Sequence, residues 1–235
     1  AAPHNYAESI PIAGLQFTIE SLNQLYADLT AGLGVPMWIG EYGFWDVSPS
    51  TLEKIARSAA DEDRLMIGGA WWQWRQSCGD PHAVTWDGGV VTVPDHTSYQ
   101  LNMLDCPGNT DLGPNEPFLR VLGRGYPRAA PGRLTSIQSD PVSGALDVVA
   151  AATPATIGGQ LVVWTPTGDP AIHPVRGEGL TTITETVVDG GRILTATVAA
   201  ECYALHVATE TTSCPDVPGP TPPAPAPVVA PRFAG

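Results

Sequence analysis

The sequence predicts a parallel α/β fold in its first half and an antiparallel β-sandwich in its second half. Helical and strand-like apolar segments alternate up to about residue 128, as they do in chains that build a parallel sheet. From about residue 133, short β-prone segments are separated by Gly, Pro and Asp. Glycine (25 residues) and proline (24) are abundant, and charged residues make up only 15% of the chain. This composition favours strands and turns over a helical bundle.

The first half supplies the alternating elements in order. Residues 15–33 carry apolar side chains at spacings of three and four, which predicts an amphipathic helix. The apolar run 35–40 predicts a buried strand. A second helix is expected to begin with Ser48 as N-cap and Pro49 in its first turn, and residues 65–74 predict a second buried strand. The apolar stripe of the first helix consists of Leu15, Ile19, Leu22, Tyr26, Leu29 and Leu33.

Residues 75–113 predict a long polar loop, and residues 115–124 a last short helix. A complete (β/α)8 barrel takes about 250 residues, so residues 1–128 suffice for the last two or three units. We therefore expect residues 1–128 to form the C-terminal portion of a TIM barrel. Its remaining strands would have to come from outside this chain.

The second half predicts a sandwich domain over residues 129–210. Residues 211–235 are rich in Pro and Ala, and we expect a disordered, partly extended tail there. The predicted strands are 134–137, 145–150, 160–164, 181–184, 193–198 and 203–207.

Charge and hydropathy exclude several classes of partner. The formal net charge is −13, from 24 acidic and 11 basic residues, so we expect no binding to nucleic acid. No apolar run approaches the roughly 18 residues of a membrane span. The chain begins at Ala1 without a signal peptide, so we expect that a leader was removed or that a longer protein contains it. We expect a monomer.

The four cysteines allow three pairings. None has C-x-x-C spacing and no His-rich tract accompanies them, which argues against a structural zinc site. The simplest pairing is local, Cys78–Cys106 and Cys202–Cys214. Together with the even count it indicates a secreted or cell-surface protein, whereas four free buried thiols are the alternative.

Three features stand where barrel strands would end, which is where such barrels place their chemistry. Gly40-Glu41-Tyr42-Gly43 follows the first apolar strand, so Glu41 would project into the barrel mouth; otherwise it merely starts a loop. In His4-Asn5-Tyr6, strand alternation points His4 and Tyr6 to one side, where the phenol could hold a carboxylate ionised. The alternative for this pair is ordinary packing.

The third feature is Trp71-Trp72-Gln73-Trp74. Indole rings stack on the apolar faces of sugar rings, and their N–H groups can donate to hydroxyls. At least one of these rings is expected to pack in the core instead.

Taken in their order along the chain, His-x-Tyr, then Glu, then Trp, the three features resemble glycoside hydrolase family 5, the retaining (β/α)8-barrel, cellulase-like enzymes. The resemblance implies that Glu41 is the nucleophile, that His4 and Tyr6 are active-site residues, and that Trp72 borders a sugar subsite, with Trp74 as a further candidate. It implies no metal and no organic cofactor. Residues 116–120 and 124–129, which run into the sandwich, resemble the endoglycoceramidase-related branch. That branch cleaves the β-linkage between a glycan and ceramide, and its relatives act on other glucosylated lipids.

One departure from the family is large. The mechanism of the family needs two carboxyl groups about 5–5.5 Å apart, one as nucleophile and one as general acid/base. In the family, the acid/base Glu lies in an Asn-Glu pair after the fourth strand of the barrel. This chain has no such segment, and Glu8, Asp46 and Glu53 match no family role. We therefore expect the chain by itself to be inactive. The alternatives are a non-catalytic carbohydrate-binding or cell-surface protein, and a family 5 enzyme that acts on polysaccharide.

Overall fold

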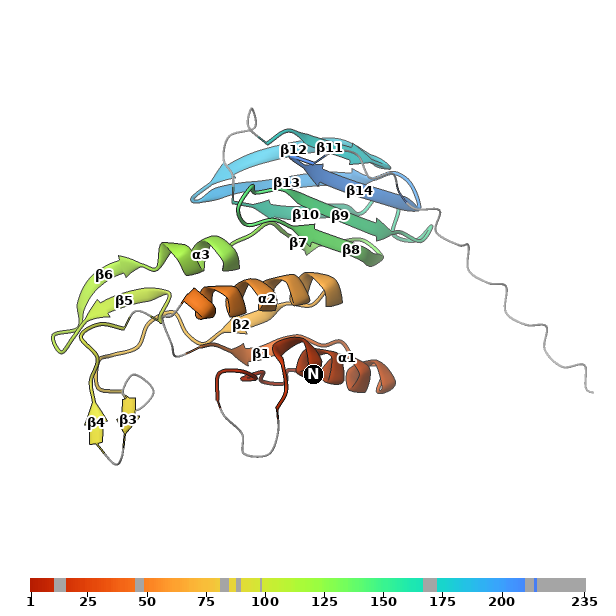
Figure 1. Ribbon diagram of the computed structural model, residues 1–235. Helices are drawn as coiled ribbons and strands as arrows, with labels where there is room; N and C mark the ends of the chain where they lie inside the picture. Colours follow the sequence, from red (N-terminus) through yellow and green to blue (C-terminus); the bar gives the residue numbers. More distant parts are fainter. Residues whose placement is uncertain are drawn as a thin grey trace, which may run out of the picture.

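The computed structural model describes residues 1–10, 16–44, 49–80, 85–87, 90–97, 99–166, 173–209 and 214. Figure 1 shows a mixed α/β molecule dominated by antiparallel sheets, with a two-layer sandwich lying over a helical part that holds α1, α2 and α3. The elements of the helical part are α1 (Ile19–Gly32), β1 (Ile39–Tyr42), α2 (Pro49–Leu65), β2 (Gly69–Trp71), β3 (Thr85–Asp87), β4 (Val90–Thr92), β5 (Asn102–Asp105), β6 (Thr110–Pro114) and α3 (Glu116–Leu122).

A small parallel sheet organises this part. β1 pairs in parallel with β2, with Ile39 opposite Gly69. On the other side, the N-terminal segment runs parallel to β1 through a bridge between His4 and Glu41. The amide of Gly40 donates to the Pro3 carbonyl at 2.8 Å. Each connection between neighbouring segments contains one helix, α1 and then α2, as the predicted α/β repeat requires.

The predicted strands are displaced or too long. Residues 35–38 are not in a strand, because the amide of Val35 bonds back to Thr30 O at 3.1 Å and closes the end of α1. β1 therefore begins at Ile39 and includes Glu41. The second predicted strand shrinks to Gly69–Trp71, because α2 continues to Leu65. The proposed cap Ser48 lies outside the described residues.

The long loop predicted over 75–113 is wrong, since two antiparallel hairpins, β3–β4 and β5–β6, lie there. The amide of Asn102 donates to Trp74 O at 2.7 Å and ties β5 to the chain leaving β2. The predicted disulfide Cys78–Cys106 is confirmed, with a Cα–Cα distance of 5.6 Å.

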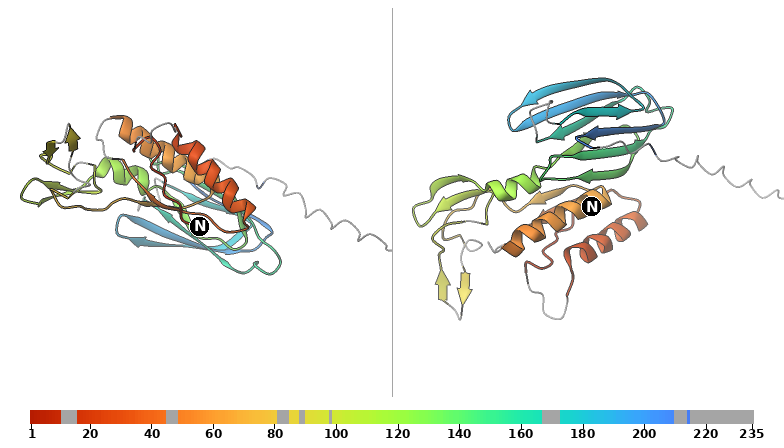
Figure 2. Two further views of the ribbon diagram at one scale, coloured as in Figure 1. Left: turned by 90° about the horizontal axis from the view of Figure 1, so that it is seen from below. Right: turned by 45° about the horizontal axis from the view of Figure 1, so that its top comes forward.

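Helix α1 is confirmed, but its buried face differs from the predicted apolar stripe. Among the described members of that stripe, Ile19 alone is buried, whereas Leu29 and Leu33 are 56% and 75% exposed. The buried face contains polar Asn23 instead, whose side chain bonds to Asn5 at 2.6 Å and to Asp61 at 2.8 Å. Figure 2 shows α1 on the far side of α2 from the sandwich.

The antiparallel sandwich is confirmed as two four-stranded sheets, ordered β12-β13-β10-β7 and β11-β14-β9-β8. Side chains such as Leu161, Leu194 and Leu205 are fully buried between the sheets. Two strands were not predicted, and one of them, β7, spans the expected domain boundary at residues 128–129. The strands are β7 (Tyr126–Ala129), β8 (Arg133–Ser139), β9 (Leu146–Ala151), β10 (Gln160–Thr165), β11 (Val175–Glu178), β12 (Leu180–Val188), β13 (Gly191–Val198) and β14 (Cys202–Val207).

The second predicted disulfide, Cys202–Cys214, is also confirmed, with a Cα–Cα distance of 6.0 Å. It joins the start of β14 to Cys214, whose amide donates to Glu178 Oε2 at 2.8 Å. Except for Cys214, the tail predicted over 211–235 lies outside the described residues.

Gly43 is required where β1 approaches the end of β2. A Cβ at this position would lie 2.3 Å from the Trp72 carbonyl oxygen. We expect Gly43→Ala to force the two strand ends apart and to lower the free energy of unfolding by about 1–3 kcal/mol in urea titrations.

The matched control is Gly68→Ala, because a Cβ on Gly68 meets nothing within 4 Å. This substitution is expected to change stability by less than about 0.5 kcal/mol. Equal stabilities of the two variants would contradict the proposed steric limit.

Candidate active site

Three side chains from two neighbouring parallel segments meet at the predicted site. The Tyr6 hydroxyl donates a hydrogen bond to Glu41 Oε1. The His4 Nδ1 atom lies 3.7 Å from the same oxygen. The amide of Asn5 donates to the Glu41 carbonyl at 2.9 Å, which fixes the register between the two segments. The structure thus brings His4, Tyr6 and Glu41 together, with His4 and Tyr6 on one side of their segment as its alternation predicted.

An irregularity in β1 directs Glu41 toward this group. The register of β1 shifts between Ile39 and Tyr42, both of which are buried. Gly40 and Glu41 lie between them and are partly exposed. Such bulges re-aim side chains at strand ends. Gly40 is needed here because a Cβ would lie 2.8 Å from the Ala2 carbonyl oxygen.

The surroundings of Tyr6 keep it a hydrogen-bond donor to Glu41. Burial of Tyr6, followed by the hydrogen bond to Glu41 and the charge of Glu41, raises the pKa of the phenol well above its usual value. Tyr6 is therefore a protonated donor at neutral pH. The side chains of Glu41 and His4 are 25% and 56% exposed, so a ligand can reach both. A carboxylate oriented by a neutral donor and open to solvent can act as a nucleophile.

Asn5 fixes the N-terminal segment to the helices from the opposite side. Its amide group donates to Ile19 O at 3.1 Å and to the Asn23 side chain, and its Oδ1 accepts from the amide of Ala7 at 2.9 Å. Asn5 is only 6% exposed. Sequence reasoning missed this residue, although its place between His4 and Tyr6 signalled the opposite, buried face.

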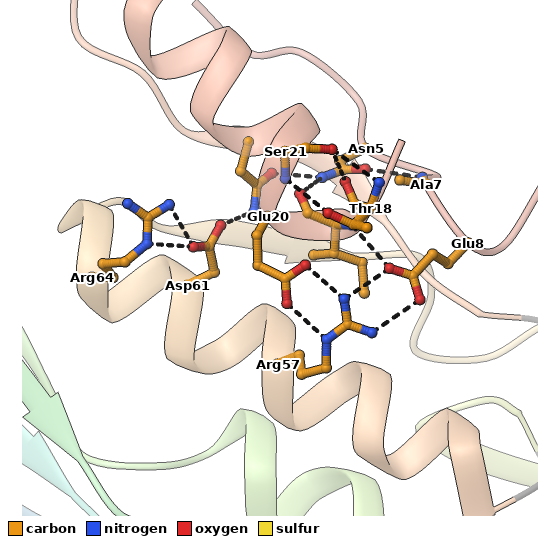
Figure 3. A network of polar contacts seen from close by, with 11 residues as sticks. Asn5, Ala7, Glu8, Thr18, Glu20, Ser21, Arg57, Asp61 and Arg64 are labelled. Carbon is orange, nitrogen blue, oxygen red and sulfur yellow. Dashed lines mark hydrogen bonds and ion pairs between the residues drawn. The ribbon is translucent and has the colours of Figure 1, made fainter. Parts of the chain in front are cut away.

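Arg57 of α2 makes a second attachment (Figure 3). Its guanidinium group pairs with Glu20 at 2.6 and 2.7 Å and with Glu8 at 2.8 and 3.0 Å. These hydrogen bonds lower the pKa of Glu20 to about 2 and also lower the pKa of Glu8. This group of Arg57, Glu8 and Glu20, here called the Arg57 clamp, joins the segment that carries Tyr6 to both α1 and α2.

The tryptophans divide as expected between core and surface. Trp71 packs against Tyr42, Phe44 and Phe118, with ring centroids 5.4–6.0 Å apart. Trp72 and Trp74 are 36% and 57% exposed. The Trp72 amide donates to Tyr42 O at 2.7 Å, which places this ring directly beyond the strand pair.

The other carboxylates near Glu41 in sequence are placed elsewhere. Glu8 is held by Arg57, and Glu53 is exposed on α2. Asp46 lies outside the described residues. Across the described ranges, no cluster of three or more His, Cys, Asp or Glu could hold a metal ion. None of the described helices combines the length and the apolar character needed to cross a bilayer.

The comparisons with known proteins give structural neighbours. A crystal structure of an endogalactoceramidase is 28% identical, with a TM-score of 0.66 over 87% of this chain and 40% of that one. Endo-glycoceramidase II from Rhodococcus sp., in its ganglioside GM3 complex, is 19% identical, with a TM-score of 0.55 over 82% of this chain and 36% of that one. Sterylglucosidase 1 from Cryptococcus neoformans is 13% identical, with a TM-score of 0.59 over 80% of this chain and 31% of that one.

These similarities show that the chain shares the fold of part of each of these structures. This chain spans about 40% of the length of the endogalactoceramidase. No protein-family model matches the sequence, and no curated protein matches it.

The Arg57 clamp predicts a pH-dependent stability. A carboxyl group whose pKa is lowered on folding stabilises the fold above its unfolded pKa and loses this contribution as pH falls. For Glu20 that window runs from about pH 5 down to its folded pKa of about 2. We expect Arg57→Gln to lower the urea midpoint at pH 7, and the difference from wild type to shrink toward pH 2.

Arg75→Gln is the control, because Arg75 and Asp111 form an exposed pair at 3.5 Å. Little change is expected for it at either pH. A difference between wild type and Arg57→Gln that stays constant with pH would show that the clamp does not hold its carboxylates ionised.

Proposed function

We propose that this chain carries the nucleophile side of the active site of a retaining β-glycosidase that is secreted or displayed at the cell surface. The observation that carries the proposal is the Tyr6–Glu41 hydrogen bond, with His4 beside it, across two parallel segments. Support comes from structural neighbours that are endoglycoceramidases and a sterylglucosidase. The two disulfides are compatible with an extracellular location.

The proposed reaction has two displacements. A carboxylate oxygen of Glu41 attacks the anomeric carbon and forms a glycosyl ester, while the bond to the leaving oxygen breaks and an acid protonates that oxygen. Water, deprotonated by the same acid/base residue, then cleaves the ester and releases the sugar with retained configuration. Neither step requires a metal or an organic cofactor. The Rhodococcus enzyme has been seen as a lactosyl-enzyme intermediate, which supports a covalent route in that protein.

Tyr6 and His4 have distinct roles in this proposal. The Tyr6 phenol orients Glu41 in the free state by donating a hydrogen bond to its carboxylate. His4 faces the same oxygen and, being more than half exposed, is placed to contact the sugar. Trp72 and Trp74 supply the exposed aromatic surface on which a sugar ring can stack.

The acid/base residue is proposed to come from polypeptide outside residues 1–235, which would complete a (β/α)8 barrel with residues 1–128. The described surface supports this. Leu25 and Leu29 on α1 and Leu33 directly after it are exposed, and Trp38 is 49% exposed. In the described residues no further strand pairs with segment 1–6 or with β2. A further parallel strand and its helix would cover these surfaces.

For the substrate we favour a glycolipid or an oligosaccharide with a β-glucosidic linkage. The structural neighbours include an endogalactoceramidase and an endo-glycoceramidase in complex with the ganglioside GM3. A polysaccharide-cleaving family 5 enzyme and a non-catalytic carbohydrate-binding or cell-surface protein are the competing functions. A covalent glycosyl ester on Glu41 separates the glycosidases from the binding protein.

The test is a 2-deoxy-2-fluoro-β-glucosyl fluoride. Fluoride leaves without protonation and the fluorine at C2 slows hydrolysis, so the ester on the nucleophile accumulates. In the native protein that contains these residues, we expect intact mass and peptide mapping to place one fluoroglucosyl group on Glu41. Glu41→Gln should abolish the label, and Tyr6→Phe should slow labelling about tenfold or more.

Glu53→Gln is the control, because Glu53 is exposed on α2, and it should be labelled like wild type. A label on another carboxylate, or no label on the native protein, would contradict the assignment of Glu41.

The separated chain should behave differently from the native protein. Residues 1–235 alone lack the proposed acid, so we expect no hydrolysis of an unactivated β-glucoside or glycolipid. Measurable turnover by this chain that is lost in Glu41→Gln would falsify the proposal that the acid lies outside it.

A further inference from the structure

A buried chain of hydrogen bonds leads from the neighbour of Glu41 to the sandwich. It begins at Tyr42, which follows Glu41 in β1 and faces the helices. Tyr42 is 6% exposed, and its ring packs edge-on against Trp71 at 5.4 Å. Burial, then the charge of Glu62 and the hydrogen bond to it, raise the pKa of the Tyr42 phenol. The residue after the proposed nucleophile is thus tied to a carboxyl group on α2.

Gly69 of β2 makes room for this contact. A Cβ at residue 69 would lie 2.2 Å from Glu62 Oε1 and 2.6 Å from Tyr42 Cε1. Burial raises the pKa of Glu62, although Arg124 acts in the opposite direction. A carboxyl group in such a place is retained only with well-formed partners, since an unpaired buried charge is costly.

Arg124 supplies those partners. Its Nη2 atom donates to Glu62 Oε2 at 3.0 Å, to Asp63 Oδ1 at 2.8 Å and to Ala59 O at 2.9 Å. Arg124 is 7% exposed and stands between α3 and β7, the first strand of the sandwich. Asp63 Oδ2 accepts from the Ser139 hydroxyl on β8. The guanidinium group therefore ties the turn between α3 and β7 to α2. Ser139 ties β8 of the sandwich to the same helix through Asp63.

We propose that Arg124 is a positioning residue for Glu41, acting through Glu62 and Tyr42. Tyr6 holds the Glu41 side chain on the exposed side of β1. The chain of hydrogen bonds through Glu62 holds the adjoining Tyr42 on the opposite side, which faces α2. The sandwich thereby contributes to the placement of the nucleophile without contacting it. The inference rests on the proposed function of Glu41 as nucleophile. The effect of Arg124 on the position of Glu41 can be tested separately.

The test follows the Tyr6 phenol, which reports on the position of Glu41. With 13C-labelled tyrosine, the Tyr6 resonance is the one missing from Tyr6→Phe. We expect Arg124→Gln and Glu62→Gln to shift this resonance and to lower the pKa of the Tyr6 phenol toward its ordinary value. Arg124→Lys should restore part of the change. Tyr42→Phe removes only the hydroxyl that bonds to Glu62, and it should shift the Tyr6 resonance even where the other variants fold poorly.

Arg192→Gln is the matched control, because Arg192 is also buried and pairs with Glu185 at 2.7 Å, within the sandwich. It should lower stability and leave the Tyr6 resonance unchanged. An unchanged Tyr6 signal in folded Arg124→Gln or Tyr42→Phe would overturn the inference. An equal change in Arg192→Gln would do the same, because the effect would then be general destabilisation.

Labelling by the fluoroglucosyl fluoride adds a functional readout in the native protein. Arg124→Gln should slow labelling of Glu41 about tenfold or more, since small displacements of reacting groups have large effects on rate. If wild type is not labelled at all, the proposed function fails, while the Tyr6 resonance still decides the positioning role. Wild-type labelling rates in Arg124→Gln would overturn that role.

Discussion

The parallel pairing of the N-terminal segment with β1 is the constraint on which the candidate site depends. It sets His4 beside Glu41, and the bond from the Asn5 amide to the Glu41 carbonyl fixes the register. A shift by one residue would turn His4 and Tyr6 toward the helices and Asn5 toward solvent. The site therefore exists because Asn5 and the Arg57 clamp hold this short segment against α1 and α2.

Much of what holds the helical part together is polar. Asn23, Asp61, Glu62, Asp63 and Arg124 are each less than 9% exposed, yet all are hydrogen-bonded. Meanwhile leucines of α1 face solvent in the described structure. Buried polar groups fix one arrangement, because each unpaired partner would be costly. The sandwich instead has an apolar core, and Ser139 on β8 bonds to Asp63 of the helical part.

The division into an α/β part and an antiparallel sandwich could be predicted from periodicity, and both disulfides from their local spacing. The meeting of Glu41 with His4 and Tyr6 was expected only from the resemblance to family 5 enzymes, since 35 residues separate Tyr6 from Glu41. The buried face of α1 could not be predicted, since Asn23 is stabilised there by distant residues, Asn5 and Asp61. The hairpins of 75–113 were missed because their strands, of three to five residues, are too short to show apolar alternation. The Glu62–Arg124 pair was missed because partners 62 residues apart in sequence leave no local pattern.

The central claim is that Glu41 is the nucleophile and that its acid/base partner lies outside this chain. A crystal structure of the native protein with a trapped fluoroglucosyl group tests it most directly. The account predicts a bond from the anomeric carbon to a Glu41 oxygen, with a second carboxyl group, from outside residues 1–235, about 5–5.5 Å away. A sugar bound to another residue, or a second carboxyl group from within this chain, would contradict it.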